Sequence, residues 1–294
     1  MNAGFHVAVV LALCALVCNG LSDIVYKRAA SAGLASHSLL QVQSMCYGAI
    51  VLAYGLLTGT LVFNAASLWG AVAGVFAFTA FYNFSRSLQA GNVSVNAPIF
   101  RLSFTVTAGL AILVLGEPAS TAKLAGLGCA LVAVWLLLGG GGSGVKEPAS
   151  AENSRNSRAS LVRVLVAMFA VAIANLIYKV ALSAGATPAG LLTVQAAAVI
   201  SLANIVLFRA EGTLKPNAKA WRFGLPAACF LSAAFILLAE SLARGPASTV
   251  VPITQMGFIV TASIGILVLR EPVTGRKLTG LAFALAALAA LSQG

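Results

Sequence analysis

Polar side chains inside long apolar stretches are the residues of this sequence that could do chemistry. Arg101 lies well inside one apolar stretch, and Gln255 occupies the matching place in a second, similar stretch. A guanidinium group can hold a carboxylate through two parallel hydrogen bonds, and a carboxamide can add others. The pair therefore predicts a binding site for a small polar ligand. The alternative is that Arg101 reaches a polar interface or joins two helices.

Matched prolines precede both residues. Pro98 stands shortly before Arg101, and Pro252 shortly before Gln255. A proline inside a helix removes a backbone hydrogen bond and bends the helix, which frees a carbonyl group. We therefore expect both stretches to bend toward a cavity close to these polar side chains.

Two further matched pairs add polar groups. Asp23 and Asn175 occupy equivalent places, as do Gln43 and Gln195. Asp23 could form a local ion pair with Lys27, one helical turn later, hold a substrate ammonium group or carry a coupling proton. Its place near the end of an apolar stretch favours the structural role.

Aromatic residues gather near the same stretches, as in FAFTAFYNF from Phe76. Such faces with a few polar tips suit an amphipathic ligand such as a large neutral amino acid, although helix packing explains many single phenylalanines. The candidate substrate-binding residues are Arg101, Gln255, Tyr82, Asn83, Phe100, Phe258, Gln43, Gln195, Asp23 and Asn175.

Three other carboxylates have structural interpretations. Glu117 and Glu271 stand in the turns that follow the fourth and ninth apolar stretches. We expect them to cap the fifth and tenth helices through free N–H groups. Glu240 lies near the end of the eighth stretch and is expected at an interface with water.

The composition identifies the solvent that surrounds these groups. Of the 294 residues, 60% are hydrophobic and only 9% are charged, and the mean hydropathy is +0.97. A soluble chain carries roughly 25% charged residues. The apolar runs are about 20 residues long, the length that crosses a bilayer. We therefore expect an all-α polytopic membrane protein, in which a charge at a helix centre costs roughly 2.5–3.5 kcal/mol unless it faces a cavity or a partner.

Ten transmembrane helices are expected from the apolar runs. They lie near residues 5–26, 39–58, 68–88, 94–115, 120–138, 161–182, 189–208, 221–243, 247–268 and 274–292. Residues 139–160 are rich in glycine, serine and charge, which is typical of a flexible aqueous linker. The chain thus divides into a first repeat of five helices (1–138), the linker (139–160) and a second repeat of five helices (161–294).

The two halves are related in sequence. IVYKRAASAGLASHSLLQVQ from Ile24 aligns without a gap on LIYKVALSAGATPAGLLTVQ from Leu176, and ILVLGEPASTAKLAGL from Ile112 aligns on ILVLREPVTGRKLTGL from Ile266. Each copy holds an odd number of spans, so the second copy must enter the membrane from the opposite side. The repeats are therefore expected to be inverted, an arrangement that suits alternating access.

The charge distribution predicts orientation. The formal net charge is +11, but the basic residues are spread among short loops and form no stripe that would favour nucleic acid. One side of the expected membrane collects nearly all of them, while the other holds only Lys123, Lys179 and Arg244. The basic side should be cytoplasmic, which would place both termini in the periplasm of a bacterial-type cytoplasmic membrane.

Neither catalysis nor a cofactor is expected. The five cysteines lie inside apolar runs, without the spacing of a disulfide framework or a metal site. The two histidines lie near expected helix ends, and no hydrolase, metalloprotease or phosphate-binding motif is present. GGGGSGVK has Val145 where a phosphate-binding loop needs lysine.

These residues resemble the drug/metabolite transporter superfamily, specifically its ten-span EamA type. The likeness rests on LGEPASTAKLAGLGCALVAVWLLL and LREPVTGRKLTGLAFALAALAAL, the hydrophobic stretch, Gly-Glu-Pro-like turn and final helix that close each repeat. Arg270 departs from the glycine usual there. The resemblance implies a central cavity among the third, fourth, eighth and ninth helices, with the fifth and tenth at the periphery.

The resemblance also implies transport, most like that of aromatic amino acid exporters. We expect export of amino acids or related small metabolites by alternating access, with possible proton coupling, from a monomer or weak dimer. Efflux of cationic drugs is the alternative within transport. It needs a carboxylate deep in the cavity, and Asp23 and Glu240 look too peripheral. A scaffold that moves no solute is the alternative from a different class.

Overall fold

The computed structural model describes residues 3–90, 96, 99–138, 151–267 and 274–293, and every regular element among them is a helix. The elements are α1 (Ala3–Ser31), α2 (Ser36–Leu57), the short 3-10 helix η1 (Ala65–Leu68), α3 (Trp69–Ala90), α5 (Ser103–Leu115), α6 (Thr121–Leu138), α7 (Ala151–Ser183), α8 (Pro188–Glu211), α9 (Ala218–Arg244), α10 (Ala247–Gln255), α11 (Phe258–Leu267) and α12 (Gly275–Leu291). Residues 99–101 form a further helical turn before α5.

The helices have the length and composition of membrane-spanning segments. Among the described residues, six helices are long and apolar enough to cross a membrane, and four shorter apolar helices cover 99–115, 121–136, 247–260 and 278–291. The all-helical, multi-pass class predicted from composition is confirmed, while the count of ten spans stays a prediction.

The helices of one repeat pack mainly on those of the other. Helix α1 packs along α9, and its repeat equivalent α7 packs along α3; α2 packs on α9 just as α8 packs on α3. The contact of α1 with α10 is likewise matched by that of α7 with α5. Such reciprocal contacts are what a twofold relation between two similar units produces.

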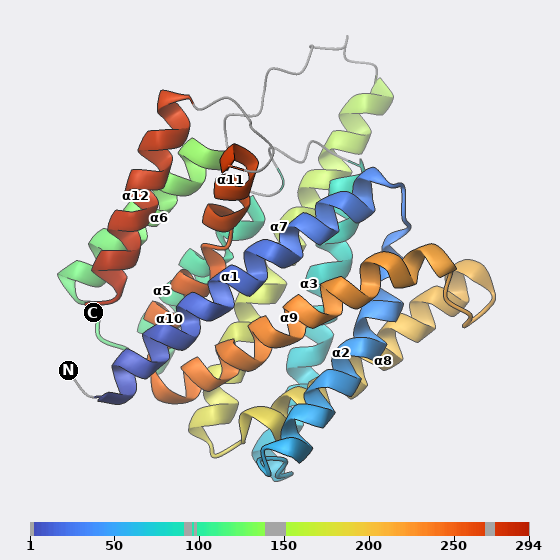
Figure 1. Ribbon diagram of the computed structural model, residues 1–294, viewed down its shortest axis with the longest axis horizontal. Coiled ribbons are helices and arrows are strands. Elements are labelled where there is room, and N and C mark those ends of the chain that lie inside the picture. Colours follow the sequence, from blue (N-terminus) through green and yellow to red (C-terminus); the bar gives the residue numbers. More distant parts are fainter. Residues whose placement is uncertain (1–2, 91–95, 97–98, 139–150, 268–273, 294) are drawn as a thin grey trace.

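The two repeats run in opposite directions. Helix α1 leads away from the end of the molecule where the N-terminus lies, whereas α7 runs back toward that end (Figure 1). The N- and C-termini lie close together at this end (Figure 1). The repeats are therefore antiparallel, as their odd number of expected spans indicated.

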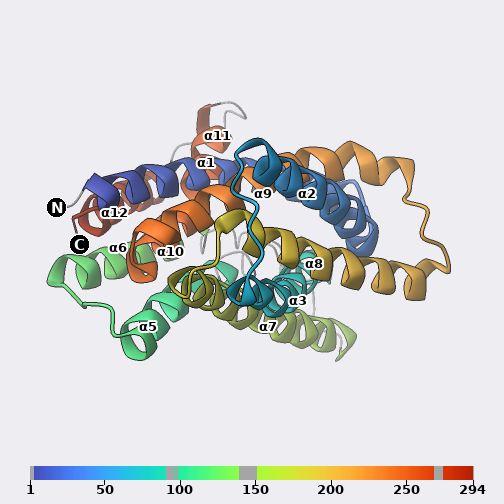
Figure 2. The same cartoon turned by 90° about the horizontal axis from the view of Figure 1, so that it is seen from below.

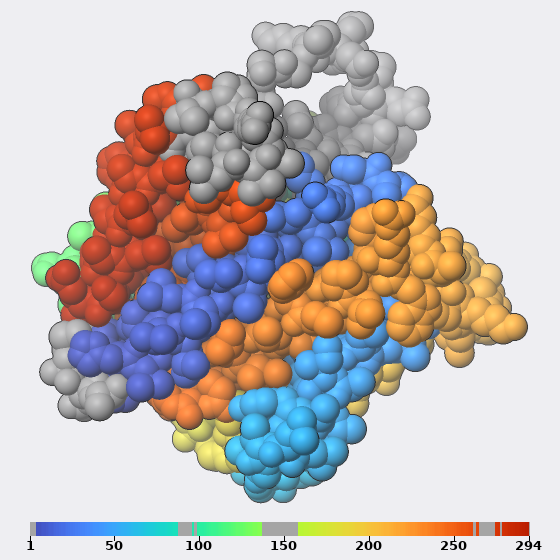
Figure 3. Space-filling model, viewed as in Figure 1, coloured from blue at the N-terminus to red at the C-terminus, as the bar shows by residue number. Residues whose placement is uncertain are grey.

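Helices α6 and α12 pair at the edge of the molecule, as expected for the fifth and tenth spans (Figure 2). The guanidinium of Arg276, in α12, donates hydrogen bonds to the carbonyl oxygens of Trp135 and Leu136, both at 3.0 Å. These carbonyls belong to the last turn of α6, where backbone acceptors lack helical partners. The space-filling view shows α1 lying directly against α9 along its course (Figure 3).

The fourth and ninth expected spans are both interrupted, although each was predicted as one continuous helix. The interruptions fall at Leu102 and Met256, which are equivalent in the repeat. The amide of Leu102 donates to the carbonyl of Ile99 and that of Met256 to the carbonyl of Ile253, both at 3.1 Å, so the turn tightens at each place. The break in the ninth span follows Pro252, which remains inside α10; Pro98 lies outside the described residues.

Close approach of α1 explains the break in the ninth span. A Cβ atom on Gly20 would lie 2.5 Å from the carbonyl oxygen of Gly257, and one on Gly257 would lie 2.8 Å from the amide nitrogen of Gly20. The side-chain amide of Asn19 donates to the carbonyl of Thr254 at 3.0 Å, satisfying an acceptor near the end of α10. The two glycines allow this close contact, and the Asn19 side chain supplies a hydrogen bond to a carbonyl near the interruption.

Helix α7 begins at Ala151, inside the segment predicted as a linker. Residues 151–160 are thus helical, and the remainder of the linker, 139–150, lies outside the described residues. Serine and asparagine are only weakly unfavourable in helix interiors. A long apolar helix can therefore continue into a polar segment that contains them. Arg270 and Glu271 also lie outside the described residues.

Candidate functional site

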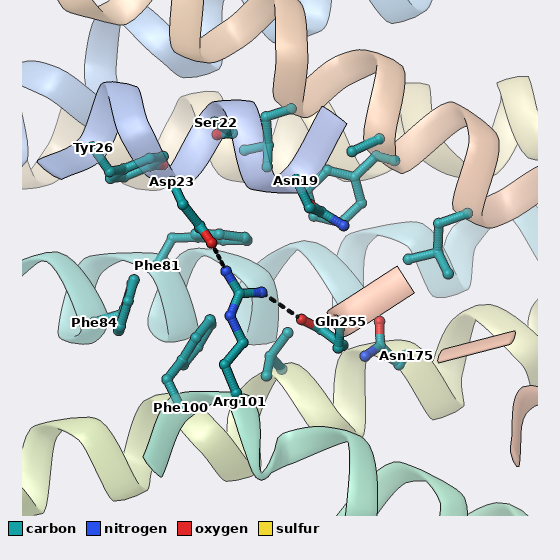
Figure 4. A pocket seen from close by; sticks show the side chains of 15 residues that line it. Asn19, Ser22, Asp23, Tyr26, Phe81, Phe84, Phe100, Arg101, Asn175 and Gln255 are labelled. Atoms are coloured by element: carbon teal, nitrogen blue, oxygen red, sulfur yellow. Dashed lines mark hydrogen bonds and ion pairs between the residues drawn. The ribbon is translucent and has the colours of Figure 1, made fainter. Parts of the chain in front are cut away.

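A cavity between the repeats contains the polar residues singled out in the sequence (Figure 4). Its lining residues are Asn19, Ser22, Asp23, Tyr26, Phe81, Phe84, Phe100, Arg101, Val171, Asn175, Leu231, Ala234, Phe235, Leu238 and Gln255. They come from α1, α3, α7, α9, α10 and the helical turn before α5. We call this space the charged cavity.

Arg101 is the central side chain of the charged cavity. It is buried, its Nη1 donates to Oε1 of Gln255 at 3.0 Å, and its Nη2 is paired with Oδ2 of Asp23 (Figure 4). The expectation that Asp23 pairs with Lys27 is wrong: Lys27 is exposed, and Asp23 turns inward to a helix far along the chain. Asp23 is therefore not peripheral, which also corrects that judgement.

The two repeats contribute equivalent residues to this cavity. Arg101 and Gln255 occupy the same repeat position and touch each other, so the pseudo-twofold axis passes close to their hydrogen bond. Asp23 and Asn175 form another equivalent pair in the lining, and so do Phe81 and Phe235. Both Arg101 and Gln255 directly precede the helix interruptions, the position where many transporters built from inverted repeats bind their substrates.

Two polar atoms in the cavity lack partners among the described residues. Nδ2 of Asn175 and Oγ of Ser22 are buried and make no hydrogen bond. An unsatisfied buried polar group costs about 1–3 kcal/mol, so these groups are poised to bind an acceptor such as a carboxylate oxygen.

The charged cavity is small. It leaves about 40 Å³ for the centres of water-sized molecules, and a single water needs roughly 10–15 Å³ on that measure. A few waters fit, but an amino acid does not unless the surrounding helices separate. In this structure the Asp23–Arg101 ion pair occupies the centre of the cavity.

A second cavity adjoins the first, and we call it the amide cavity. Its lining residues are Leu40, Gln43, Ser44, Tyr47, Ala77, Phe78, Phe81, Gln195, Val199, Leu231 and Phe235. Leu231, Phe81 and Phe235 border both cavities, and the two phenylalanine rings meet edge to face with centroids 6.0 Å apart. The matched glutamines Gln43 and Gln195 therefore lie in a space next to Arg101, separated from it by aromatic rings.

The other predicted residues divide between the cavity and its surroundings. Phe100 lines the charged cavity and stacks on Phe84 at 4.1 Å. Tyr82, Asn83 and Phe258 line neither cavity: Tyr82 stacks on Phe78, the Asn83 amide donates to the carbonyl of Thr79 within its own helix, and Phe258 belongs to the apolar core.

Glu117 caps a different helix from the one expected. Its carboxylate accepts hydrogen bonds from the amides of Ala247 and Ser248, at 2.7 and 2.8 Å, and from the Ser248 hydroxyl. These donors form the first turn of α10, not of α6. A carboxylate at a helix N-terminus is stabilised by the free N–H groups and the helix dipole. The contact joins the turn between α5 and α6 to the helix that carries Gln255.

Glu240 lies one turn before the end of α9, and its expected place at an interface with water stays a prediction. It is paired with Arg244 one turn later, and its Oε1 accepts a hydrogen bond from the Tyr54 hydroxyl at 2.6 Å. It lines neither cavity.

Several lining residues were missed in the sequence. Asn19, Ser22 and Tyr26 flank Asp23 at helical spacing, so one face of α1 carries all four. That spacing was a readable signal. Phe81 and Phe235 are equivalent in the repeat alignment, which was a second signal. Tyr47 offered none, because its repeat equivalent is Val199.

Among the described residues, apolar helices in two antiparallel halves with a polar cavity between them are typical of membrane transporters built from inverted repeats. The model of the EamA-like transporter family matches residues 6–139 and again residues 159–293. The chain therefore belongs to the EamA-like transporter family of the drug/metabolite transporter superfamily and is a multi-pass membrane transporter of small molecules.

The fold recurs among solved structures. One crystal structure, titled only as that of a protein, superposes with a TM-score of 0.78 and covers 96% of this chain and 95% of its own, at 13% sequence identity. This likeness shows the shared fold alone. No curated protein matches the chain.

Proposed function

We propose that this protein exports zwitterionic amino acids, including large neutral or aromatic ones, by alternating access across a bacterial-type cytoplasmic membrane. The observation that carries the proposal is Arg101, which is buried on the axis between the repeats and held by Asp23 and Gln255. A substrate carboxylate would pair with the Arg101 guanidinium, and a substrate ammonium would pair with the Asp23 carboxylate that is released.

Charge balance supports a zwitterion. The Asp23–Arg101 pair is neutral as a unit, and so is an amino acid at neutral pH. When the substrate replaces each partner of the pair by its own group of the same charge, no buried charge is left uncompensated. An unpaired buried charge costs about 3–5 kcal/mol, so a substrate with one charge alone binds far less well.

The unpartnered donors point to the carboxylate end of such a substrate. Nδ2 of Asn175 and Oγ of Ser22 can donate to carboxylate oxygens that Arg101 does not satisfy. The aromatic walls supplied by Phe81, Phe100 and Phe235 suit the apolar body of a large neutral side chain.

Efflux of cationic drugs is the second candidate. Asp23 supplies the carboxylate in the cavity that a cation needs. A cation that took Asp23 would leave Arg101 with Gln255 alone, which makes this candidate weaker. A scaffold without transport has no use for a cavity on the pseudo-twofold axis.

Energy coupling and oligomeric state belong to the same proposal. Asp23 is the carboxylate placed to carry a coupling proton, because its release from Arg101 is the step that substrate binding requires. We propose a monomer or weak dimer with both termini in the periplasm and with Gln43 and Gln195 serving as additional polar contacts.

Counterflow of labelled amino acids into liposomes that contain the purified protein tests the proposal. Arg101→Ala should lower the flux roughly 10- to 100-fold, and Gln255→Ala several-fold, because a hydrogen bond to a charged group contributes about 1.5–3 kcal/mol. Arg244→Ala and Gln293→Ala, which alter an arginine and a glutamine outside both cavities, should retain the flux. Wild-type liposomes that exchange cationic dyes but no amino acid would favour drug efflux; unchanged flux in both cavity variants would remove the site.

A further inference from the structure

The amide cavity contains polar atoms that the fold leaves unsatisfied. Tyr47 and Gln195 line it, with 4% and 2% of their surfaces exposed. The Tyr47 hydroxyl and the Oε1 atom of Gln195 make no hydrogen bond within the part of the chain that the structure describes. Buried polar groups are satisfied in the large majority of native structures, so each exception needs an explanation.

The first repeat shows that the fold can satisfy such an oxygen internally. The Tyr26 hydroxyl donates to Oε1 of Gln43 at 2.5 Å. Tyr178 and Gln195 are the repeat equivalents of this pair, and their side chains face each other, yet neither the Tyr178 hydroxyl nor Oε1 of Gln195 makes a hydrogen bond of normal geometry to any described residue. The same local sequence thus forms a short hydrogen bond in one half and none of normal geometry in the other. Gln195 lines the amide cavity, so a ligand bound there would lie beside its side chain.

The remaining walls of the amide cavity are apolar. They are supplied by Leu40, Phe78, Phe81, Val199, Leu231 and Phe235. An apolar slot with one carboxamide oxygen and one phenolic hydroxyl at its polar side matches the chemistry of a group with an apolar body and a hydrogen-bond donor at its tip. The slot leaves about 30 Å³ for the centres of water-sized molecules, so it admits such a group only when the surrounding helices separate.

We propose that the amide cavity is the subsite for the substrate side chain and that it selects side chains with an apolar body ending in a hydrogen-bond donor, such as a phenol or an indole. This inference rests on the proposed function, because the substrate's ammonium and carboxylate groups occupy the adjoining charged cavity. The side chain passes between Phe81 and Phe235, whose rings separate the two cavities. Its donor reaches Oε1 of Gln195, and the Tyr47 hydroxyl completes the contact.

The selectivity follows from the cost of an empty hydrogen-bonding site. A binding site built to hold a substrate hydroxyl or N–H group discriminates strongly against the analogue that lacks it, because the polar groups of the site stay unpaired. Two neutral groups left unsatisfied should produce roughly 10- to 100-fold discrimination.

Competition against counterflow tests the subsite with matched pairs of substrates. Tyrosine against phenylalanine, and threonine against 2-aminobutyrate, differ in one hydroxyl group. Each compound competes with whichever labelled amino acid the wild-type protein exchanges fastest. Wild type should prefer tyrosine over phenylalanine by about 10- to 100-fold. Gln195→Met, which keeps the volume, and Tyr47→Phe should reduce that ratio toward one while phenylalanine still competes.

Tyr54→Phe is the matched control. It removes a tyrosine hydroxyl from the same helix, α2, but Tyr54 lines neither cavity and bonds to Glu240. The ratio should not change in this variant. Equal competition by tyrosine and phenylalanine in the wild type, or an unchanged ratio in both Gln195→Met and Tyr47→Phe, overturns the subsite while leaving amino acid transport standing.

A failure of the proposed function gives a different result. Wild-type liposomes would then exchange no amino acid at all. Thermal stabilisation of the purified protein by tyrosine and by phenylalanine decides the subsite in that case: greater stabilisation by tyrosine that is lost in Gln195→Met supports it, and equal or absent stabilisation refutes it.

Discussion

The two repeats carry the same geometry around the axis but different charges. Asp23 and Arg101 belong to the first repeat, and their equivalents in the second repeat are Asn175 and Gln255. The exchange of Asp23 for Asn175 keeps the shape of the side chain and removes its charge, whereas the exchange of Arg101 for Gln255 removes the charge and shortens the side chain. The site therefore has one ion pair and two neutral carboxamides on a nearly symmetric frame, so a bound zwitterion would meet a single arrangement of opposite charges.

This distribution yields a prediction about stability. Asp23→Asn should destabilise the protein by about 3–5 kcal/mol, because it leaves Arg101 buried without its counterion. The double variant Asp23→Asn with Arg101→Gln should recover most of that loss, because it gives the first repeat the neutral pair that the second already has. Thermal unfolding of the detergent-purified proteins measures both effects.

Both variants should also differ from the wild type in transport. Neither should exchange zwitterions, because each lacks the carboxylate that accepts the ammonium group. A double variant no more stable than the single one, or a single variant as stable as wild type, would show that the pair contributes little. Either result would contradict the role assigned here to Asp23.

At the scale of elements, the interrupted helices determine where the polar groups lie. Leu102 and Met256 end the helical turns that carry Arg101 and Gln255, and α1 crosses the second interruption at Gly20. Asn19, in the adjoining position of α1, hydrogen-bonds the Thr254 carbonyl there. The same helix face presents Asp23 to Arg101. The close crossing of α1 therefore determines both the hydrogen bond from Asn19 to the Thr254 carbonyl and the ion pair of Asp23 with Arg101.

The crossing can be tested with a single methyl group. Gly20→Ala should destabilise the protein by about 1–3 kcal/mol, because its Cβ would lie 2.5 Å from a backbone oxygen that cannot move alone. Gly128→Ala is the matched control: Gly128 also lies within an apolar helix, α6, and its Cβ would meet no atom within 4 Å.

The control should be neutral or slightly stabilising, since alanine favours helix by about 1 kcal/mol over glycine. Chemical denaturation or thermal unfolding in detergent separates the two variants. Equal stability of Gly20→Ala and Gly128→Ala would mean that α1 does not approach the interruption closely.

At the scale of the whole molecule, the antiparallel repeats place both chain ends on one side. Helix α1 begins and α12 ends at the same end of the bundle (Figure 1). Basic residues occur at the opposite helix ends, for example Arg28 in the last turn of α1 and Arg209 in the last turn of α8. From the positive-inside rule we expect the end with the termini to be periplasmic.

Reporter fusions test this orientation. A reporter active only outside the cytoplasm should be active when fused to either terminus and inactive when inserted after Gly212, in the loop between α8 and α9. Activity at one terminus only would contradict the antiparallel arrangement of an even number of spans. Activity only in the loop would reverse the orientation and would make the charged loops periplasmic.

The sequence by itself determined the class of fold, the inverted repeat and most of the paired site residues. These properties depend on local patterns: an apolar run long enough for the bilayer forms a helix whatever its neighbours are. A gapless alignment of two segments shows which residues are equivalent under the pseudo-twofold axis. Arg101, Gln255, Asp23 and Asn175 were found in this way, and all four line one cavity.

Only the tertiary structure decided which polar groups meet. Asp23 pairs with Arg101 rather than with Lys27, and Glu117 caps α10 rather than α6. The break at Met256 likewise lies where α1 crosses the ninth span. Which residue pairs with a buried charge depends on the distance and direction between helices that are far apart in the sequence. Leaving a buried charge without a partner costs more free energy than an ion pair at the surface contributes, so the buried pairing prevails over the local one.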